Sequence, residues 1–305
     1  MNIKLFSFSF LLFSINAFIP RHQVITNLNV RYNNIASKSL SILDNNILDF
    51  LKNKSGKKYI LTDLKNNKMY KFEDFKIKFP DLKKKKLISI SPGGYKGFYY
   101  MGVILYIKQN YNISDNLLTG ASAGAWTSLF ASYKYDMQTI SEDILDINFK
   151  NIESIFEMQL MLKERLLNNY KFEDFTHQNI FIGVTMLRGL ELSTNIFFNF
   201  RSLEDIIDCC IASSHIQLLT GGLINKFNKE ITFYGGFSNY PYLNLNNTVL
   251  HINPCIWSKH ESINYYDLIF KKKEDYNRLY EKGYYDTRVN KHILDKKLNS
   301  NNQTI

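Results

Sequence analysis

A serine surrounded by small residues is the strongest chemical signal in this sequence of 305 residues. Ser122 is the centre of a Gly-x-Ser-x-Gly pattern, and it stands between a predicted strand over 117–119 and a predicted helix over 125–133. A nucleophile at the tip of a strained strand-to-helix turn needs neighbours without bulk. The neighbours here are Gly120, Ala121, Ala123 and Gly124. The free N–H groups that open such a helix also stabilise nearby negative charge. The pattern predicts a nucleophilic serine, and the simpler alternative is a turn whose serine caps the helix.

A glycine-rich turn precedes this serine and reads Pro-Gly-Gly-Tyr-Lys-Gly over 92–97. Two parallel strands joined by one helix would bring both turns together at the carboxyl edge of a sheet. The backbone N–H groups of Gly93 and Gly94 could then hold the oxyanion formed when the serine attacks an ester. The predicted oxyanion turn comprises Gly93, Gly94, Lys96 and Gly97. A dinucleotide-binding loop is the competing interpretation, but Pro92 occupies the first glycine position of that fingerprint.

Strands alternate with helices along the chain, which predicts an α/β layered fold with a largely parallel sheet. The predicted strands lie at 58–62, 87–91, 117–119, 180–186, 231–233 and 248–252. The predicted helices lie at 45–52, 98–109, 125–133 and 203–212. A long C-terminal helix is expected over 265–298, with a break at Gly283.

Composition excludes several classes of protein. The chain is 45% apolar and 22% charged, which is normal for a globular protein and excludes collagen, a coiled coil and disorder along most of the chain. It has three cysteines without a Cys-x-x-Cys pair, so neither a disulfide scaffold nor a zinc site is expected. No apolar run reaches about 18 residues, so no transmembrane helix is expected.

Positive charge is concentrated in the N-terminal part of the chain. Residues 1–86 contain 17 Lys and Arg against 6 Asp and Glu, a charge of +11, whereas residues 87–305 contain 21 against 22. A solvated lysine-rich surface over 52–86 is the simple interpretation, and attraction to an anionic membrane surface is the sharper one. Nucleic acid is not expected as a partner, because its proteins usually carry their excess charge on the folded binding face.

The first 45 residues have the features of targeting segments. Residues 1–17 consist of a short basic start, an apolar stretch and a small residue, Ala17, which predicts a signal peptide cleaved after that alanine. Residues 18–43 are basic and contain no acid, as in transit peptides. The Ala-Phe junction resembles the two-part plastid-targeting signals of algae with secondary plastids. We expect entry into the secretory pathway, with a plastid as a further destination; a cytoplasmic or membrane-associated protein with a hydrophobic N-terminus is the alternative.

The segments SISPGGYKGFYYMGVILYI and TGASAGAWTSL resemble the patatin-like phospholipase family, in particular its animal-type branch. The resemblance continues through Ser202–Ala212 and through FYGGFSNYP at 233–241. It implies a patatin-like three-layer α/β/α domain with a largely parallel central sheet. The expected organisation is a signal peptide (1–17), a transit-like or disordered segment (18–45), a lysine-rich extension (46–86), the patatin-like domain (87–290) and a polar tail (291–305).

The resemblance also implies a Ser–Asp dyad, and this sequence departs from it. The family's Asp precedes Gly-Gly or Gly-Ala, with Asn and Pro following. Gly235 and Gly236 fit that motif, but Tyr234 occupies the position of the Asp. A phenol with a pKa near 10 is a poor base at pH 7. Pro92 stands where the family has a glycine and removes one backbone N–H.

Three explanations of the missing Asp remain open. The protein is a pseudoenzyme that keeps the fold and binds lipid, or His215 or His251 is the base, or Tyr234 acts as base with a pKa lowered by Lys96. The preferred prediction is a lipid acyl hydrolase for phospholipid, galactolipid or acylglycerol esters, with Ser122 as nucleophile and no metal or organic cofactor. The alternatives are an inactive lipid-binding relative, and docking on a membrane surface through the lysine-rich segment.

Overall fold

The computed structural model describes residues 59–147, 154–188, 191–216, 225–233, 235–237, 241–257 and 276–299. All of them belong to Leu51–Ile305, the second of the two units into which contacts divide the chain. The predicted signal peptide, the transit-like segment and the helix at 45–52 lie outside the described residues and stay predictions. Within the described ranges, no helix is long and apolar enough to cross a bilayer.

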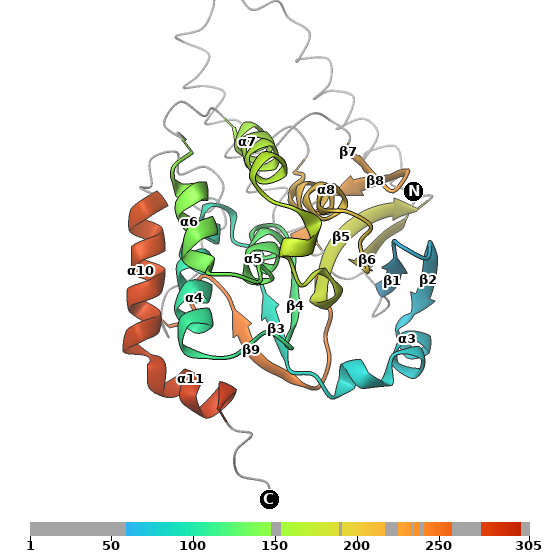
Figure 1. The fold of residues 1–305 in the computed structure, drawn as a ribbon. Helices are drawn as coiled ribbons and strands as arrows, with labels where there is room; N and C mark the ends of the chain where they lie inside the picture. Colours follow the sequence, from blue (N-terminus) through green and yellow to red (C-terminus); the bar gives the residue numbers. More distant parts are fainter. Residues whose placement is uncertain are drawn as a thin grey trace, which may run out of the picture. The chain divides into compact units, whose positions relative to one another are not determined.

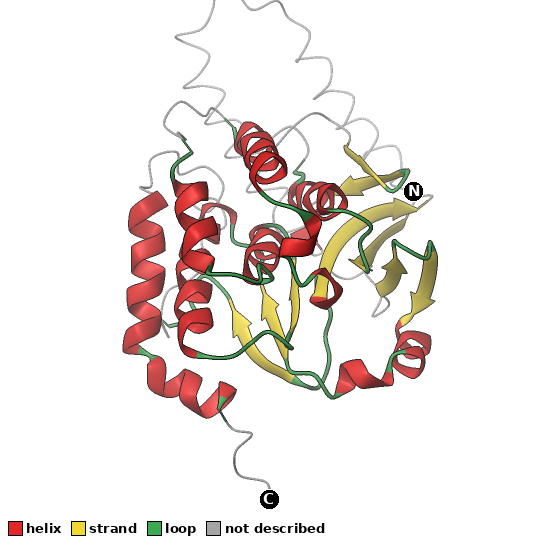
Figure 2. Cartoon of the chain, in the orientation of Figure 1, coloured by secondary structure: helices red, strands yellow, loops and turns green. Residues whose placement is uncertain are grey.

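The strands of the described residues form one mixed sheet, drawn as arrows in Figure 1 and in yellow in Figure 2. Its main path runs β2-β1-β6-β5-β4-β3-β9, and β8 pairs with β5 and β7 beside that path. The strands are β1 (Tyr59–Asp63), β2 (Lys68–Lys71), β3 (Leu87–Ile90), β4 (Leu117–Gly120), β5 (Ile180–Arg188), β6 (Glu191–Phe198), β7 (Asn225–Phe227), β8 (Glu230–Phe233) and β9 (Thr248–Ile252). Neighbours among β5, β4, β3 and β9 are parallel. Every residue of β3 and β4 is buried, as is typical of central parallel strands.

Helices α4, α5 and α8 cover one face of this sheet, and α6 and α10 pack against them (Figure 1). The helices are α3 (Phe72–Lys78), α4 (Gly97–Asn110), α5 (Ala123–Ala131), α6 (Met137–Leu145), α7 (Ile155–Asn169), α8 (Leu203–Ser214), α10 (Tyr276–Val289) and α11 (Lys291–Leu298). Alternate strand residues such as Ile88, Ile90 and Leu118 join these helices in the larger core. The prediction of an α/β fold with a largely parallel central sheet and flanking helices is confirmed.

The other face of the sheet carries a smaller aromatic core. Phe75 of α3 is 1% exposed and packs against Phe198, with ring centroids 5.3 Å apart, and against Phe181 at 6.2 Å. Strand β1 pairs in parallel with β6. The sheet therefore extends into residues 59–86, which precede the limit of 87 expected for the domain.

The C-terminal helices pack closely on α4. A Cβ atom on Gly102 would overlap the carbonyl oxygen of Tyr280, and one on Gly283 would overlap the carbonyl oxygen of Tyr99. The two backbones thus touch at both glycines. The predicted break at Gly283 is wrong: this glycine lies inside α10, where it serves close packing, and the described helices separate at Asn290. Residues 265–275 of the predicted helix lie outside the described residues.

This contact predicts the effect of one added methyl group. We expect Gly283→Ala to lower the free energy of unfolding by about 1–3 kcal/mol, because neither backbone can move without disturbing the core. Gly97→Ala is the matched control, since its Cβ would meet Ala123 alone, at 3.3 Å from Cβ and 3.9 Å from Cα. Urea denaturation of both proteins measures the difference. Equal stability of the two variants would contradict the proposed close packing.

Candidate active site

Ser122 has a backbone conformation that residues with side chains rarely adopt. Its φ is 54° and its ψ is −123°, and such a conformation costs about 1–3 kcal/mol and persists only where the surroundings impose it. Ser122 occupies the N-cap position of α5, yet its side chain makes no capping hydrogen bond. The alternative of an ordinary capping serine is therefore wrong, because a capping residue has an extended backbone and its oxygen accepts from the first turn.

Close approach of the chain to itself explains the two glycines of the motif. Gly120 ends β4, and a Cβ atom there would overlap the backbone of Gly124. A Cβ atom on Gly124 would overlap the carbonyl group of Ile90, the last residue of β3. The start of α5 therefore packs directly on the ends of both strands. A side chain at either glycine would push α5 away and open the turn at Ser122.

Ser213, near the end of α8, holds the turn from the other side. The Ser122 N–H donates to Ser213 Oγ at 2.8 Å, and that hydroxyl donates to the carbonyl oxygen of Gly183 on β5 at 2.6 Å. All three residues are far apart in sequence, and Ser213 is fully buried. The sequence did not predict a role for Ser213, because a serine near the end of a helix gives no signal of a hydrogen bond to a distant turn.

The glycine-rich turn lies beside the serine. Ile90 pairs with Gly120 in the register of β3 and β4, so both strands end at the same edge. Gly94 has a φ of 51°, in the left-handed region that favours glycine. Among the described residues, neither the Gly93 nor the Gly94 N–H has an acceptor.

Two other members of the predicted oxyanion turn have their N–H groups engaged. The Lys96 N–H donates to the carbonyl oxygen of Gly93 at 3.0 Å, and the Gly97 N–H donates to that of Gly94. Pro92 has no N–H, and its carbonyl oxygen accepts from the hydroxyl of Tyr100 at 3.2 Å. Gly93 and Gly94 are thus the members with N–H groups available to an oxyanion.

The first glycine of the altered Asp motif also reaches the serine turn. A Cβ atom on Gly235 would lie 2.8 Å from Ser213 Oγ and 3.1 Å from Ala121 Cβ. Gly235 and Gly236 form part of a short 3-10 turn. Tyr234 lies outside the described residues, so its predicted role stays a prediction. The motif that replaces the family's Asp segment is nevertheless anchored against the turn that carries Ser122.

Neither histidine considered as a base is hydrogen-bonded to Ser122. His251 Nδ1 lies 2.8 Å from Ser89 Oγ, and its Nε2 lies 3.4 Å from the Tyr242 hydroxyl. Ser89 alternates along β3 with Ile88 and Ile90 of the larger core, so this cluster lies on the face of the sheet opposite α4 and α5. Burial lowers the pKa of His251.

His215 follows α8 and is 4% exposed. Burial lowers the pKa of its imidazole, and its Nε2 has no partner within the described ranges. No described side chain makes a hydrogen bond with Ser122 Oγ. Among the described residues, the backbone of Ser122 is fixed by hydrogen bonding and the N–H groups of Gly93 and Gly94 are free, but no base contacts the Ser122 hydroxyl.

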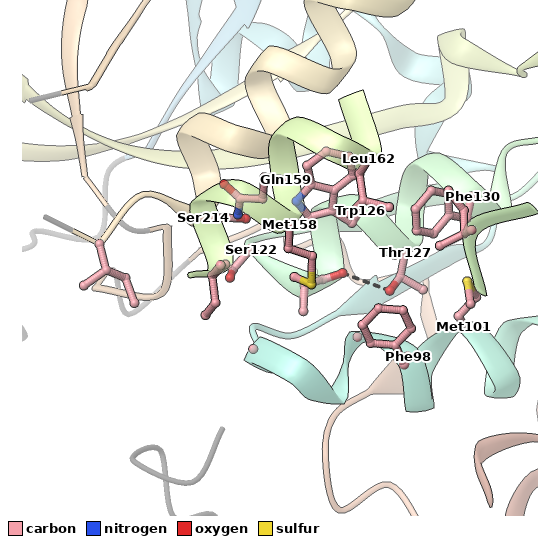
Figure 3. A pocket seen from close by; sticks show the side chains of 16 residues that line it. Phe98, Met101, Ser122, Trp126, Thr127, Phe130, Met158, Gln159, Leu162 and Ser214 are labelled. Carbon is pink, nitrogen blue, oxygen red and sulfur yellow. Dashed lines mark hydrogen bonds between the residues drawn. The ribbon is translucent and has the colours of Figure 1, made fainter. Parts of the chain in front are cut away.

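Ser122 opens into a narrow apolar pocket, shown in Figure 3. Its free volume is about 60 Å³. Most of its lining is apolar and comes from α4, α5 and α7: Phe98, Met101, Trp126, Phe130, Met158 and Leu162. Phe98 stacks on Tyr276 of α10 with ring centroids 4.5 Å apart, so the C-terminal helix supports one wall. An apolar pocket next to a nucleophile suits the hydrocarbon part of an acyl group. Among the described residues, no cluster of three or more His, Cys, Asp or Glu side chains could hold a metal ion.

An α/β sheet that carries a strained serine between a strand and a helix, beside a glycine-rich turn, defines a hydrolase-type fold. A model of the patatin-like phospholipase family matches residues 88–246, slightly more than half of the chain. The chain belongs to this family, whose members are generally serine lipid acyl hydrolases. The matched region includes both turns and the Gly235-Gly236 pair. No curated protein sequence matches the chain significantly.

The strain at Ser122 predicts an increase in stability when it is relieved. We expect Ser122→Gly to raise the free energy of unfolding by about 1 kcal/mol, because the strain removed exceeds the added flexibility of the unfolded chain. Ser122→Ala removes the same hydroxyl but keeps the strain, so it is the matched control. Urea denaturation distinguishes them, and a Ser122→Gly protein no more stable than Ser122→Ala would contradict the strained conformation.

The bond between α8 and the serine turn predicts a second effect. Ser213→Ala leaves the Ser122 N–H and the Gly183 carbonyl oxygen without their partner, which should cost about 1–3 kcal/mol of stability. Ser128→Ala is the control, because Ser128 is equally buried but donates only to the Gly124 carbonyl one turn back in its own helix. Equal losses in the two variants, measured by urea denaturation, would mean that Ser213 does not hold the turn.

Proposed function

We propose that the protein is a serine-dependent lipid acyl hydrolase in which Ser122 is the nucleophile. The observation that carries this proposal is the strained conformation of Ser122 next to an apolar pocket. A turn of ordinary structural function would not need a serine at a φ of 54°, and the surrounding glycines and Ser213 are arranged so that this conformation persists. Family membership supplies the reaction class.

The proposed reaction follows from the atoms around the serine. A bond forms between Ser122 Oγ and the acyl carbon, the serine loses its proton, and the carbonyl oxygen becomes negative. The N–H groups of Gly93 and Gly94 stabilise that oxygen. The oxyanion reverts to a carbonyl as the ester bond to the alcohol breaks, and the alcohol leaves with the proton that Ser122 lost. Water then attacks the acyl-serine, releases the carboxylic acid and restores the hydroxyl.

The rate of this reaction is expected to be low. Tyr234 replaces the carboxylate that the family uses, and a phenol with a pKa near 10 accepts little of the serine's proton at pH 7. Oxyanion stabilisation and binding still leave residual catalysis when the base is missing. In this proposal, the N–H groups of Gly93 and Gly94 stabilise the oxyanion, and the pocket binds the acyl group.

A second candidate function is binding of an acyl lipid without hydrolysis. The observation that favours it is the lack of any described side chain in hydrogen-bond contact with Ser122 Oγ. Docking on a membrane through the lysine-rich segment has weaker support. Lys83–Lys86 directly precede β3 and therefore lie at the amino edge of the parallel strands, whereas Ser122 follows β4 at the carboxyl edge.

Covalent labelling with a fluorophosphonate tests the proposal. We expect the full-length parent to be labelled slowly and Ser122→Ala not to be labelled, as read by intact mass. Tyr234→Asp restores the family's base and should raise the labelling rate by about 100-fold or more. Tyr234→Asn is the matched control, because it removes the phenol without supplying a carboxylate, and no gain is expected.

The outcomes separate the two candidates. Labelling of the parent at Ser122, together with hydrolysis of p-nitrophenyl octanoate, supports the hydrolase. An unlabelled parent with a labelled Tyr234→Asp protein supports the lipid-binding candidate, in which one residue has removed the chemistry. If neither protein is labelled, Ser122 is not a nucleophile and the hydrolase proposal fails.

A further inference from the structure

The pocket beside Ser122 contains two buried polar atoms that lack hydrogen-bond partners among the described residues. They are Oε1 of Gln159 on α7 and Nε1 of Trp126 on α5. Gln159 is only 2% exposed and Trp126 is 7% exposed. Both residues line the pocket (Figure 3). A buried polar atom without a partner costs about 1–3 kcal/mol, so two of them on one pocket require an explanation.

Apart from the proposed nucleophile Ser122, two other polar side chains of the lining, Thr127 and Ser214, are satisfied by their own helices. Thr127 Oγ1 donates to the carbonyl oxygen of Ala123 at 2.9 Å, and Ser214 Oγ donates to that of Cys210 at 2.9 Å. These hydroxyls need nothing from a ligand. The amide oxygen of Gln159 has no such donor, and the indole N–H of Trp126 has no such acceptor. These two atoms therefore remain available to a ligand in the pocket.

The two atoms have complementary chemistry. The indole Nε1–H of Trp126 can only donate a hydrogen bond, and Oε1 of Gln159 can only accept one. Figure 3 shows the indole nitrogen of Trp126 on the side of the ring that faces Gln159. A hydroxyl group on a ligand can accept from the indole N–H and donate to the amide oxygen at the same time. The remaining lining is largely hydrocarbon, which suits the rest of an acyl chain.

We propose that this pocket recognises acyl chains that carry a hydroxyl group, with Gln159 and Trp126 as the specificity-determining residues. The inference rests on the proposed function in that it assigns the same pocket to the acyl group, and it goes further by naming the class of acyl chain. The hydroxyl accepts from the indole Nε1–H and donates to the Gln159 amide oxygen. An unsubstituted chain leaves both atoms unpaired, and sites built for a hydroxyl discriminate against analogues that lack it.

Calorimetric titration of the full-length protein with free acids tests this inference without any need for catalysis. The ligands are octanoic acid and a panel of monohydroxyoctanoic acids with the hydroxyl on successive carbons. We expect at least one isomer to bind about 10-fold more tightly than octanoic acid, which corresponds to about 1.4 kcal/mol. The preference should identify the chain position that lies between the two side chains.

Variants assign the preference to the two residues. Gln159→Leu removes the side-chain amide, and Trp126→Phe removes the indole N–H. In each variant we expect the hydroxy acid and octanoic acid to bind within about 2-fold of each other. Met161→Leu is the matched control, since Met161 lies on the same helix as Gln159 and packs against the larger core without lining the pocket, and it should keep the preference. The two variants act on different helices, so a folding defect in one leaves the other as a test.

The contrary results are equally definite. If every isomer binds no more tightly than octanoic acid, or if no acid binds, the inference is overturned and water alone fills the space between the two atoms. A preference that survives both variants would also overturn it. None of these results bears on Ser122, whose labelling tests the hydrolase proposal separately.

Discussion

The site depends on one steric constraint, the contact of the first turn of α5 with the ends of β3 and β4. Because Gly120 and Gly124 have no side chains, the backbone of α5 can lie directly against the strands. That contact leaves too little chain between β4 and α5 for a relaxed connection, and Ser122 absorbs the difference with its positive φ. The hydrogen bond to Ser213 then ties the strained residue to α8. In this strained and supported conformation, Ser122 lines the pocket.

The same contact organises the electrostatics. The glycine-rich turn follows β3, and β3 ends level with β4. The N–H groups of this turn therefore lie beside Ser122 because the two strands are neighbours in the sheet. Preorganised N–H groups of this kind lower the energy of a developing negative charge because they do not have to reorient during the reaction. In the proposed reaction, proton transfer would instead depend on the residue at position 234, which follows β8 and belongs to neither turn. Under that proposal, a substitution at position 234 would remove the base and leave the glycine-rich turn and the pocket in place.

Much of this arrangement could be predicted from sequence because it is local. Strands 87–91 and 117–119, the two small-residue turns and the helices after them are coded by short runs, and the structure agrees to within a few residues. The register that aligns the turns follows from two parallel strands joined by one helix. Helices α6 and α7 and strand β6 were not predicted. α7 contributes Gln159 to the pocket. The sequence does not predict this position, because it depends on how α7 packs on the rest of the fold.

Ser213 and Gly283 illustrate why the rest could not be predicted. A serine in a helix gives no signal of its bond to a turn 91 residues away, and a glycine in a helical pattern does not show which backbone packs against it. The assignment of His251 as a possible base failed for a similar reason. Its strand position was predicted, but the face of the sheet that its ring would occupy depended on a register known only from the fold.

The contact between α4 and α10 restricts how this protein can change over evolutionary time. Gly102 and Gly283 each meet a main-chain carbonyl of the opposite helix, not a side chain. A larger residue at either position therefore cannot be compensated by a smaller one elsewhere, because every amino acid has the same carbonyl group. A destabilising substitution of Gly102 or Gly283 therefore cannot be rescued by a second substitution that shortens a neighbouring side chain. The helix α10, which follows the family-matched region, is thereby packed against α4, the helix that follows the glycine-rich turn, and both contact positions must remain glycine.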